Sequence, residues 1–288
     1  MLSYRHTFHA GNHADVLKHC VLLHLLDYLT QKDKAFWYID SHAGAASHDL
    51  RSDWAQKNAE FDSGISRLWK EKTLPPALAE YVALIRSFNA DVADGALRHY
   101  PGSSRIALTK LRAGDRMRLF ELHPSESQTL QHFYAGQSRQ IQQQVQVQAM
   151  DGFDGLRAVL PPAPRRALVL IDPSYEDKND YARVRSALAD AMQRFATGVY
   201  LLWYPLVQRR EPRLMVDTLK KQFPQNWLHV TLTVKAPAED GFGLHGSGLF
   251  VLNPPWTLPG MLKTTLPVLT RLLGQDAQAG WSLDSKIQ

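Results

Sequence analysis

The chain has 288 residues, enough for one large α/β domain or two small ones. Its composition, 44% hydrophobic and 21% charged residues, excludes a disordered, collagen-like or coiled-coil protein. The single cysteine, Cys20, excludes an internal disulfide framework and a multi-cysteine metal site. The longest apolar runs fall short of the ~20 residues that span a bilayer, and no signal-peptide pattern is present, so a cytoplasmic protein without a membrane partner is predicted.

Lys and Arg number 33 against 28 Asp and Glu, which gives a formal net charge of +5. A basic excess favours polyanions such as nucleic acids, although many basic proteins bind none. His9 and His13 have a spacing that can hold a metal on one helical face. Because Gly11 and Asn12 interrupt that helix and no Glu or Cys accompanies the pair, we predict no metal site.

Short apolar runs alternate with amphipathic stretches along the chain. The predicted strands are 35–40, 116–122, 144–150, 167–172, 198–204, 227–234 and 248–253, the last of which closes the series. Several are continuous apolar runs, typical of strands buried on both faces of a mainly parallel sheet. Helical patterns such as 180–195 and 213–223 lie between them, at the spacing of βαβ units. We therefore predict a doubly wound α/β fold with its ligand at the carboxyl ends of the strands.

The interval 48–100 breaks this rhythm because it shows no strand. Apolar residues from Trp54 to Leu68 keep the spacing of an amphipathic helix, and a second helical pattern runs over 78–88 after two prolines. We interpret 48–100 as a small inserted helical subdomain within a catalytic domain made of 1–47 and 101–288. Two ordinary connecting helices explain the pattern equally well.

Acidic residues follow four of the predicted strands: Asp40, Glu121, Asp151 and Asp172. The carboxyl ends of parallel strands meet at one edge of the sheet, where such an acid can accept hydrogen bonds from ribose hydroxyls or read an adenine edge. Each acid is alternatively a helix N-cap, and Asp151 is well placed for that role. Gly44, in the turn after the first strand, allows the backbone to approach a ligand or simply makes a tight turn.

The segment Asp172-Pro173-Ser174-Tyr175 directly follows the apolar strand 167–172. A carboxylate and a main-chain carbonyl can accept both N–H bonds of a planar amine such as N6 of adenine and direct its lone pair out of the ring plane. An aromatic ring beside them can stack on a flipped-out base. The alternative is a plain strand–turn boundary, since Asp-Pro commonly starts turns.

The order of these motifs is similar to that of S-adenosylmethionine-dependent methyltransferases that act on amino groups. The N-terminal run MLSYRHTFHAGNHADVLKH, with YPGS, ELHP, DGF, ATGVYLLWYP and NPPW, resembles the RlmJ family of 23S ribosomal RNA adenine-N6 methyltransferases over almost the whole chain. The resemblance implies a Rossmann-like methyltransferase sheet with helices on both faces and an inserted helical subdomain. It also implies S-adenosyl-L-methionine as cofactor and 23S rRNA, free or in an early ribosomal precursor, as substrate of a monomer.

Carried over residue by residue, the resemblance implies a cofactor site built from both ends of the chain. Its members are Lys18, His19, His42, Ser103, Glu121, Asp151, Gly152 and Asp172. Asp172 is then the catalytic acceptor, with Pro173 supplying a carbonyl and Tyr175 the stacking face. Tyr4 is expected to touch the RNA, and Arg5 beside it suits a phosphate contact.

Two positions depart from the family pattern, since Ser174 stands for a second proline and Ala46 for a glycine. Alanine at 46 costs about 1 kcal/mol if that position needs a positive φ. The NPPW segment starting at Asn253 is interpreted as a structural strand terminus, because it follows the last predicted strand. Two other functions stay open: adenine-N6 methylation of DNA, and non-catalytic nucleic-acid binding linked to the use of external DNA.

Overall fold

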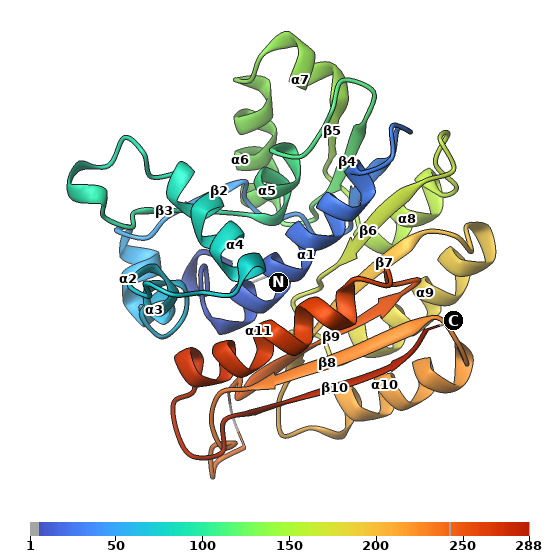
Figure 1. The fold of residues 1–288 in the computed structure, drawn as a ribbon. Helices are drawn as coiled ribbons and strands as arrows, with labels where there is room; N and C mark the ends of the chain where they lie inside the picture. Colours follow the sequence, from blue (N-terminus) through green and yellow to red (C-terminus); the bar gives the residue numbers. More distant parts are fainter. Residues whose placement is uncertain (1–5, 242, 288) are drawn as a thin grey trace.

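An eight-stranded sheet with strand order β10-β8-β9-β7-β6-β1-β4-β5 forms the centre of the molecule (Figure 1). The computed structural model describes residues 6–241 and 243–287. The strands of the sheet are β1 Trp37–Asp40, β4 Arg116–Phe120, β5 Val145–Gln148, β6 Ala167–Ile171, β7 Val199–Leu206, β8 Trp227–Thr233, β9 Gly246–Leu252 and β10 Gly280–Lys286. A second, two-stranded sheet pairs β2 Ser47–Asp49 with β3 His99–Pro101.

The strands from β5 to β7 are parallel, and β9 inserts antiparallel between β7 and β8. The chain builds outward from β1 through β4 to β5, then returns to the other side of β1 with β6 and β7. The order therefore reverses at β1, and in such sheets the crevice beyond the strands' carboxyl ends at that point receives the ligand. The predicted α/β fold is confirmed.

Helices cover both faces of the sheet (Figure 1). They are α1 His13–Thr30, α2 Asp53–Asn58, α3 Ile65–Trp69, α4 Pro76–Ser87, α5 Ser103–Leu108, α6 Pro124–Ala135, α7 Arg139–Gln144, α8 Gly152–Val159, α9 Asp180–Arg194, α10 Arg210–Gln222 and α11 Leu258–Leu273, with 3-10 turns η1 His6–Phe8, η2 Glu60–Ser63 and η3 Ala93–Gly95. In this described part of the chain, no helix is long and apolar enough to cross a membrane.

Alternate side chains of the strands belong to two separate apolar cores. On β6, Leu168 and Leu170 join the core formed with α1, α4, α5 and α11, whereas Val169 and Ile171 join the core formed with α8, α9 and α10. The period of two along a strand directs successive residues to opposite faces, so a strand covered on both sides is apolar throughout. This explains why the buried strands were recognisable as continuous apolar runs.

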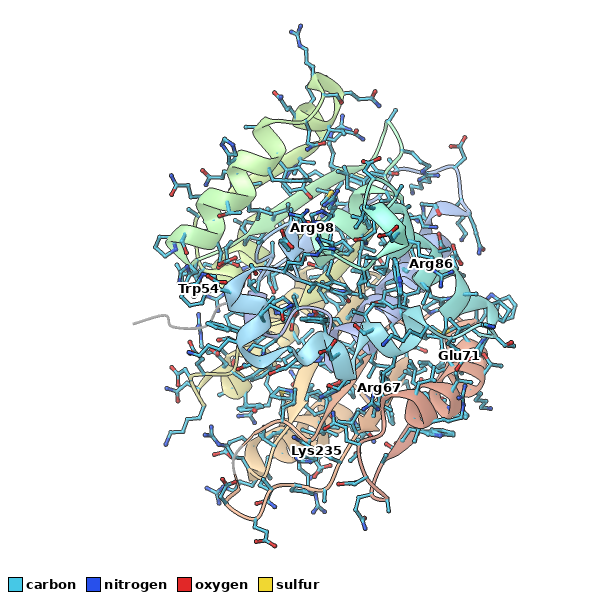
Figure 2. All side chains as sticks on the ribbon, turned by 90° about the vertical axis from the view of Figure 1, so that its left-hand side faces the viewer. Trp54, Arg67, Glu71, Arg86, Arg98 and Lys235 are labelled. Atoms are coloured by element: carbon cyan, nitrogen blue, oxygen red, sulfur yellow. The ribbon has the colours of Figure 1, made fainter. Side chains whose placement is uncertain are left out.

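The segment between β2 and β3 carries the helices expected in 48–100, but the first of them is broken. Instead of one helix from Trp54 to Leu68, the chain forms α2, η2 and α3, with a left-handed residue at Ala59 (φ 45°). Arg67 of α3 donates from Nη1 to the carbonyls of Leu272 and Gly274 at 2.9 and 2.8 Å. Figure 2 shows Arg67 on the face that this insertion presents.

Three short or polar strands escaped the sequence analysis. β2 and β3 have only three residues each, so no periodicity identifies them. The prediction that 248–253 closes the series is wrong, because β10 pairs antiparallel with β8 at the edge of the sheet. Its sequence, GWSLDSK, is mostly polar and exposed, as is common for an edge strand, and therefore lacks the apolar signal of the inner strands.

Candidate active site

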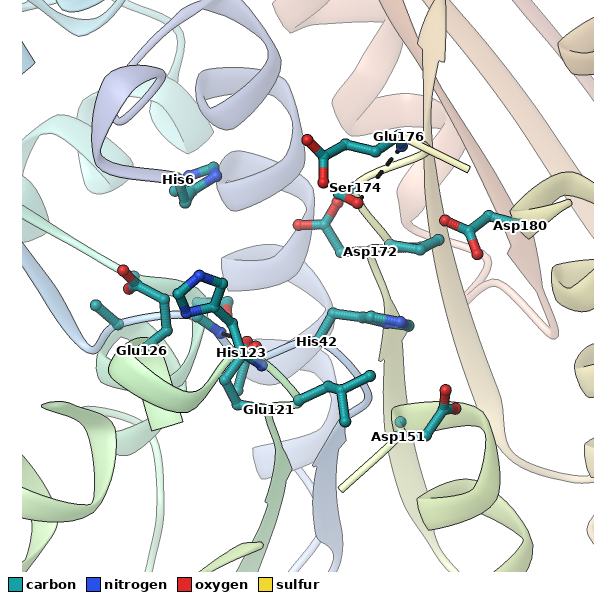
Figure 3. Close-up of a pocket in the computed structure, with 18 of the residues that line it drawn as sticks. His6, His42, Glu121, His123, Glu126, Asp151, Asp172, Ser174, Glu176 and Asp180 are labelled. Carbon is teal, nitrogen blue, oxygen red and sulfur yellow. Dashed lines mark hydrogen bonds between the residues drawn. The ribbon is translucent and has the colours of Figure 1, made fainter. Parts of the chain in front are cut away.

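A cavity of about 670 Å³ opens at the carboxyl ends of β1, β4 and β6 (Figure 3). Its volume is in the range of ordinary small-molecule sites. The predicted site residues that line it are Lys18, His19, His42, Ser103, Glu121, Asp151, Gly152, Asp172 and Pro173. The cavity thus brings together side chains that are up to 155 positions apart in the sequence. Tyr4 and Arg5 lie outside the described residues.

Glu121 follows β4 and is fixed by two backbone donors. The N–H of Gly44 donates to its Oε2 at 2.8 Å, and the N–H of His123 donates to its Oε1 at 2.7 Å. Burial raises the pKa of this carboxyl group, an effect that the two backbone hydrogen bonds oppose. Each carboxylate oxygen retains a second lone pair for a hydroxyl of a bound ligand.

The turn after β1 supplies the N–H of Gly44 that donates to Glu121. Gly44 has φ +56°, and a Cβ there would meet nothing within 4 Å, so glycine is required by the backbone conformation alone. Ala46 does not have a positive φ, unlike Gly44, so the cost considered for alanine at this position does not arise. The departure from the family pattern at Ala46 is therefore accommodated by the turn.

Asp151 is both a helix cap and a wall of the cavity. Its Oδ1 accepts from the N–H of Phe153 at 2.9 Å at the start of α8, and its Oδ2 lies 2.6 Å from Nη2 of Arg183. Gly152 follows in van der Waals contact with the loop after β1, because a Cβ on it would lie 1.6 Å from the carbonyl oxygen of Ser41. Only glycine lets α8 approach the strand so closely.

Asp40 behaves differently from the other strand-end acids. It is fully buried and does not line the cavity. Tyr38 donates to it at 2.7 Å and Ser103 at 2.6 Å, so the hydroxyl of Ser103 is already engaged. Burial raises the pKa of Asp40 to about 6. Asp40 therefore connects the start of α5 to the end of β1 and does not face the cavity.

Asp172 at the end of β6 is paired with a lysine from α1. Nζ of Lys18 lies 2.5 Å from Oδ2 of Asp172 and 2.9 Å from Oδ1 of Asp15. Asp15 is buried and also accepts from the N–H of Gly11 at 2.9 Å and contacts Nε2 of His6 at 2.9 Å. Burial lowers the pKa of Lys18, but the two carboxylates outweigh it and the net shift is upward. The lysine is therefore charged at the cavity.

Sequence reasoning missed Asp15 and did not place His6, which it associated with RNA contact, on the wall of the cavity. The available signal was positional, since Asp15 precedes Lys18 by three and His19 by four residues, on one face of a helix. The contact between His6 and Asp15 depends on the turn of the chain at Gly11 (φ +76°), and no local sequence pattern reveals it.

The two predicted cofactor-site histidines are neutral, and His19 is buried whereas His42 is partly buried. Burial lowers the pKa of His19 to about 3 and that of His42 to about 4. Nδ1 of His19 lies 2.8 Å from the hydroxyl of Tyr100, and Nδ1 of His42 lies 2.7 Å from Oγ of Ser41. The ring of His42 packs edge-on against Phe153 with centroids 5.0 Å apart. Both rings therefore offer neutral walls near the charged pair.

Tyr175 does not line the cavity in this structure. It has φ +54° and is buried, its hydroxyl donates to the carbonyl of Trp203 at 2.9 Å, and its ring lies 4.5 Å from that of Tyr181. Pro173 and Ser174, by contrast, lie on the cavity wall. The stacking role of Tyr175 stays a prediction.

The segment that begins at Asn253 lies far from this cavity. Because β9 runs antiparallel to β7, its last residue Leu252 pairs with Tyr200 near the amino end of β7. The side-chain amide of Asn253 donates to the carbonyls of Ala196 and Gly198 at 2.7 Å each. Its interpretation as a structural strand terminus is confirmed.

Within residues 6–241 and 243–287, no group of three or more His, Cys, Asp or Glu side chains is arranged to hold a metal.

A sheet that reverses at β1, a glycine turn and acids at the ends of neighbouring strands define an α/β methyltransferase site. The chain belongs to the family described as "Ribosomal RNA large subunit methyltransferase D, RlmJ", whose model matches residues 33–287. The residues present fit S-adenosylmethionine, the cofactor of this class, because Glu121 offers ribose acceptors and the turn at Gly44 leaves open space beside it.

Relatives support this membership along the whole chain. Ribosomal RNA large subunit methyltransferase J of Escherichia coli (strain K12) is 45% identical over 269 residues, covering 93% of each chain. The protein of that name from Haemophilus influenzae is 42% identical over 284 residues, covering 99% of this chain and 98% of the relative. The crystal structure of protein LPL1258 from Legionella pneumophila matches with a TM-score of 0.87 and 34% identity, over 97% of this chain and 100% of that one.

Proposed function

We propose that this protein transfers a methyl group from S-adenosylmethionine to N6 of an adenosine in 23S rRNA, as a cytoplasmic monomer with no membrane partner. The observation that carries the proposal is the placement of Asp172 and Pro173 on the wall of the same cavity as Glu121. Family membership supports an rRNA substrate, either free or within an early ribosomal precursor.

On this proposal the cofactor supplies an electrophilic methyl group, and the chain positions the amine. The Asp172 carboxylate and the Pro173 carbonyl accept the two N–H bonds of N6, which turns its lone pair out of the ring. The N6–methyl bond would form as the methyl–sulfur bond breaks, with S-adenosylhomocysteine as the leaving group. As N6 becomes cationic, the negative charge of Asp172 stabilises it, an interaction that strengthens in the transition state, and N6 then releases one proton to water. Lys18 holds the carboxylate in place through the 2.5 Å contact.

The remaining predicted residues hold the cofactor. Glu121 accepts from the ribose hydroxyls, and Asp151 with the backbone of Gly152 reads the adenine edge. Lys18, His19 and His42 contact the cofactor from α1 and the turn after β1.

Three other residues contact the RNA substrate. Tyr175 becomes the stacking face for the target base once the loop after β6 rearranges, and Tyr4 and Arg5 contact the RNA.

The substitution Asp172→Asn tests the catalytic assignment. The amide keeps the shape and one acceptor oxygen but loses the charge, so single-turnover methylation of unmodified 23S rRNA should slow by about 100-fold or more while affinity for S-adenosylhomocysteine changes little. Asp217→Asn, on an exposed side chain of α10, is the matched control. A single-turnover rate equal to that of the wild type would remove Asp172 from the reaction.

Substrate comparison separates this function from the two that the sequence left open. Labelled S-adenosylmethionine is offered with unmodified 23S rRNA, with duplex DNA of the same sequence, and with no nucleic acid. Label on the RNA alone supports the proposal, label on the DNA supports a DNA methyltransferase, and no label on either supports a non-catalytic binder.

A further inference from the structure

The segment between β2 and β3 carries an exposed aromatic side chain that contacts Phe8 of η1. Trp54 on α2 is 50% exposed, and the ring of Phe8 meets it edge-on with centroids 5.0 Å apart. Two residues before Phe8, His6 lines the active cavity and packs against the ring of His48 at 5.3 Å. The aromatic pair therefore continues outward from the wall of the active cavity.

A second, basic cleft of about 420 Å³ lies in the same part of the chain. The side chains that line it include Arg51, Phe88, Asp91, Arg98, His99 and Arg105. Arg51 precedes Trp54 by three residues, so the cleft and the exposed ring share one short stretch of chain. Figure 2 shows Trp54 and Arg98 on the same face of the molecule.

Arg105 occupies the cleft as a half-buried cation. Its guanidinium lies 4.5 Å from the ring centroid of Phe88 and 5.5 Å from that of Phe133, and Nη1 donates to Oγ of Ser47 at 2.8 Å. Among the residues that the structure describes, no carboxylate forms a salt bridge with it. Burial lowers the pKa of Arg105.

The charges of the cleft favour an anion. Arg98 already neutralises Asp49, with Nε and Nη2 at 3.2 and 3.0 Å from Oδ2. Arg51 and Arg105 also line the cleft, and Asp91 is the one carboxylate among its lining residues. A phosphate group accepts hydrogen bonds from such guanidinium groups and compensates the charge of Arg105.

We propose that Phe8, Arg51, Trp54, Arg98 and Arg105, called here the α2 face, bind the single-stranded RNA next to the target adenosine. A phosphate occupies the arginine cleft, and a neighbouring base stacks on Trp54. This inference rests on the proposed function, because it takes the base in the active cavity to belong to RNA. Arginines interleaved with an exposed aromatic ring are suited to unpaired bases and their backbone, whereas a duplex hides its base faces.

Binding of a protein-free 23S rRNA fragment to the full chain tests the α2 face. Trp54→Ala should weaken binding by about five-fold or more, through lost stacking. Arg51→Ala should weaken it and reduce the slope of log K against log salt concentration by about one, through a lost phosphate contact. Affinity for S-adenosylhomocysteine and the melting temperature should stay at wild-type values, since both side chains are on the surface.

Matched controls lie on other surfaces of the molecule. Trp256→Ala removes a tryptophan that is 76% exposed after β9, and Arg213→Ala removes an exposed arginine of α10. Both should bind RNA as the wild type does. Wild-type affinity and salt slope in the Trp54→Ala, Arg51→Ala double variant would overturn the inference, as would equal losses in the control variants or equally tight binding of duplex DNA. Wild-type protein that binds the RNA but methylates none would contradict the proposed function and not the α2 face.

Discussion

Asp15 connects three parts of the active site through one buried carboxylate. It contacts the Lys18 ammonium, the ring of His6 and the N–H of Gly11. Burial raises the pKa of Asp15, but His6 and Lys18 outweigh it and hold this pKa well below the usual range. Lys18 in turn contacts Asp172. The position of Lys18, the partner of Asp172, is therefore set by a residue that does not itself line the cavity.

Asp15→Asn should destabilise the fold and slow methyl transfer together. Removing one charge from a buried network leaves the others uncompensated, which costs about 3–5 kcal/mol. Thermal melting and single-turnover rates measure the two effects, with Asp217→Asn on exposed α10 as control. A melting temperature equal to that of the wild type would show that the carboxylate is dispensable.

Glu121→Gln should weaken S-adenosylhomocysteine binding while RNA affinity stays close to that of the wild type. The amide keeps one acceptor oxygen but leaves the N–H of Gly44 or His123 facing a donor, at a cost of about 1–3 kcal/mol. Calorimetry measures the cofactor affinity, and the exposed Glu239→Gln is the control. Parallel losses of both affinities would instead indicate a folding defect.

For single residues, the sequence identified the acids that follow the strands, because the end of an apolar run locates them. It did not separate Asp40, which is buried in hydrogen bonds, from Glu121, which faces the cavity. It also did not place the ring of Tyr175 beneath the cavity wall, since that depends on packing against Tyr181 and Trp203. Such differences come from tertiary contacts and leave no local pattern.

Among the elements, α8 illustrates how one residue fixes a helix against the sheet. Gly152→Ala places a Cβ where the carbonyl of Ser41 stands, so α8 must move away from the loop after β1. We expect a cofactor affinity reduced by about tenfold or more and a lower melting temperature. Gly260→Ala is the matched control, because a Cβ at that helical glycine of α11 meets nothing within 4 Å and alanine favours a helix. Unchanged cofactor affinity in Gly152→Ala would contradict the close-packing argument.

The inner strands and long helices were predictable because burial on both faces, or on one stripe, imposes a clear apolar pattern. The observed β6 and α9 start at the residues that the sequence indicated and end within one residue of those limits. The insertion was harder, since α2 and α3 have six and five residues and depend on the turn at Ala59. Short elements of this kind are stabilised by their surroundings and not by their own periodicity.

The molecule as a whole should lose stability in mild acid. Burial lowers the pKa of several histidines to about 3 or 4: His13, His19, His42, His48 and His229. Below about pH 6.5 the unfolded chain takes up protons that the folded protein cannot, so each such histidine removes about 1.4 kcal/mol per pH unit. Asp40, with a pKa raised to about 6, opposes this below pH 6 but offsets only one histidine.

Melting temperatures measured between pH 7.5 and pH 5 test this dependence. We expect a steep fall, because the summed effect over one pH unit is comparable with the 5–15 kcal/mol stability of a typical domain. The variant His229→Gln should show a shallower dependence than the wild type, since one of the titrating groups is gone. A melting temperature that is constant over this range would mean that the histidines are protonated in the folded protein.

The central position of α1 has a consequence for the newly made protein. This helix near the start of the chain packs against α4 and α5 and also against β7, β9 and α11 from the last third. Its Lys18 meets Asp172 across 154 residues of sequence. During synthesis, the apolar residues of α1 that pack against α11 therefore have no partner until α11 has been made. Closing so large a loop is also slow. An unfinished chain that lacks α11 therefore leaves part of the apolar surface of α1 exposed, which favours aggregation.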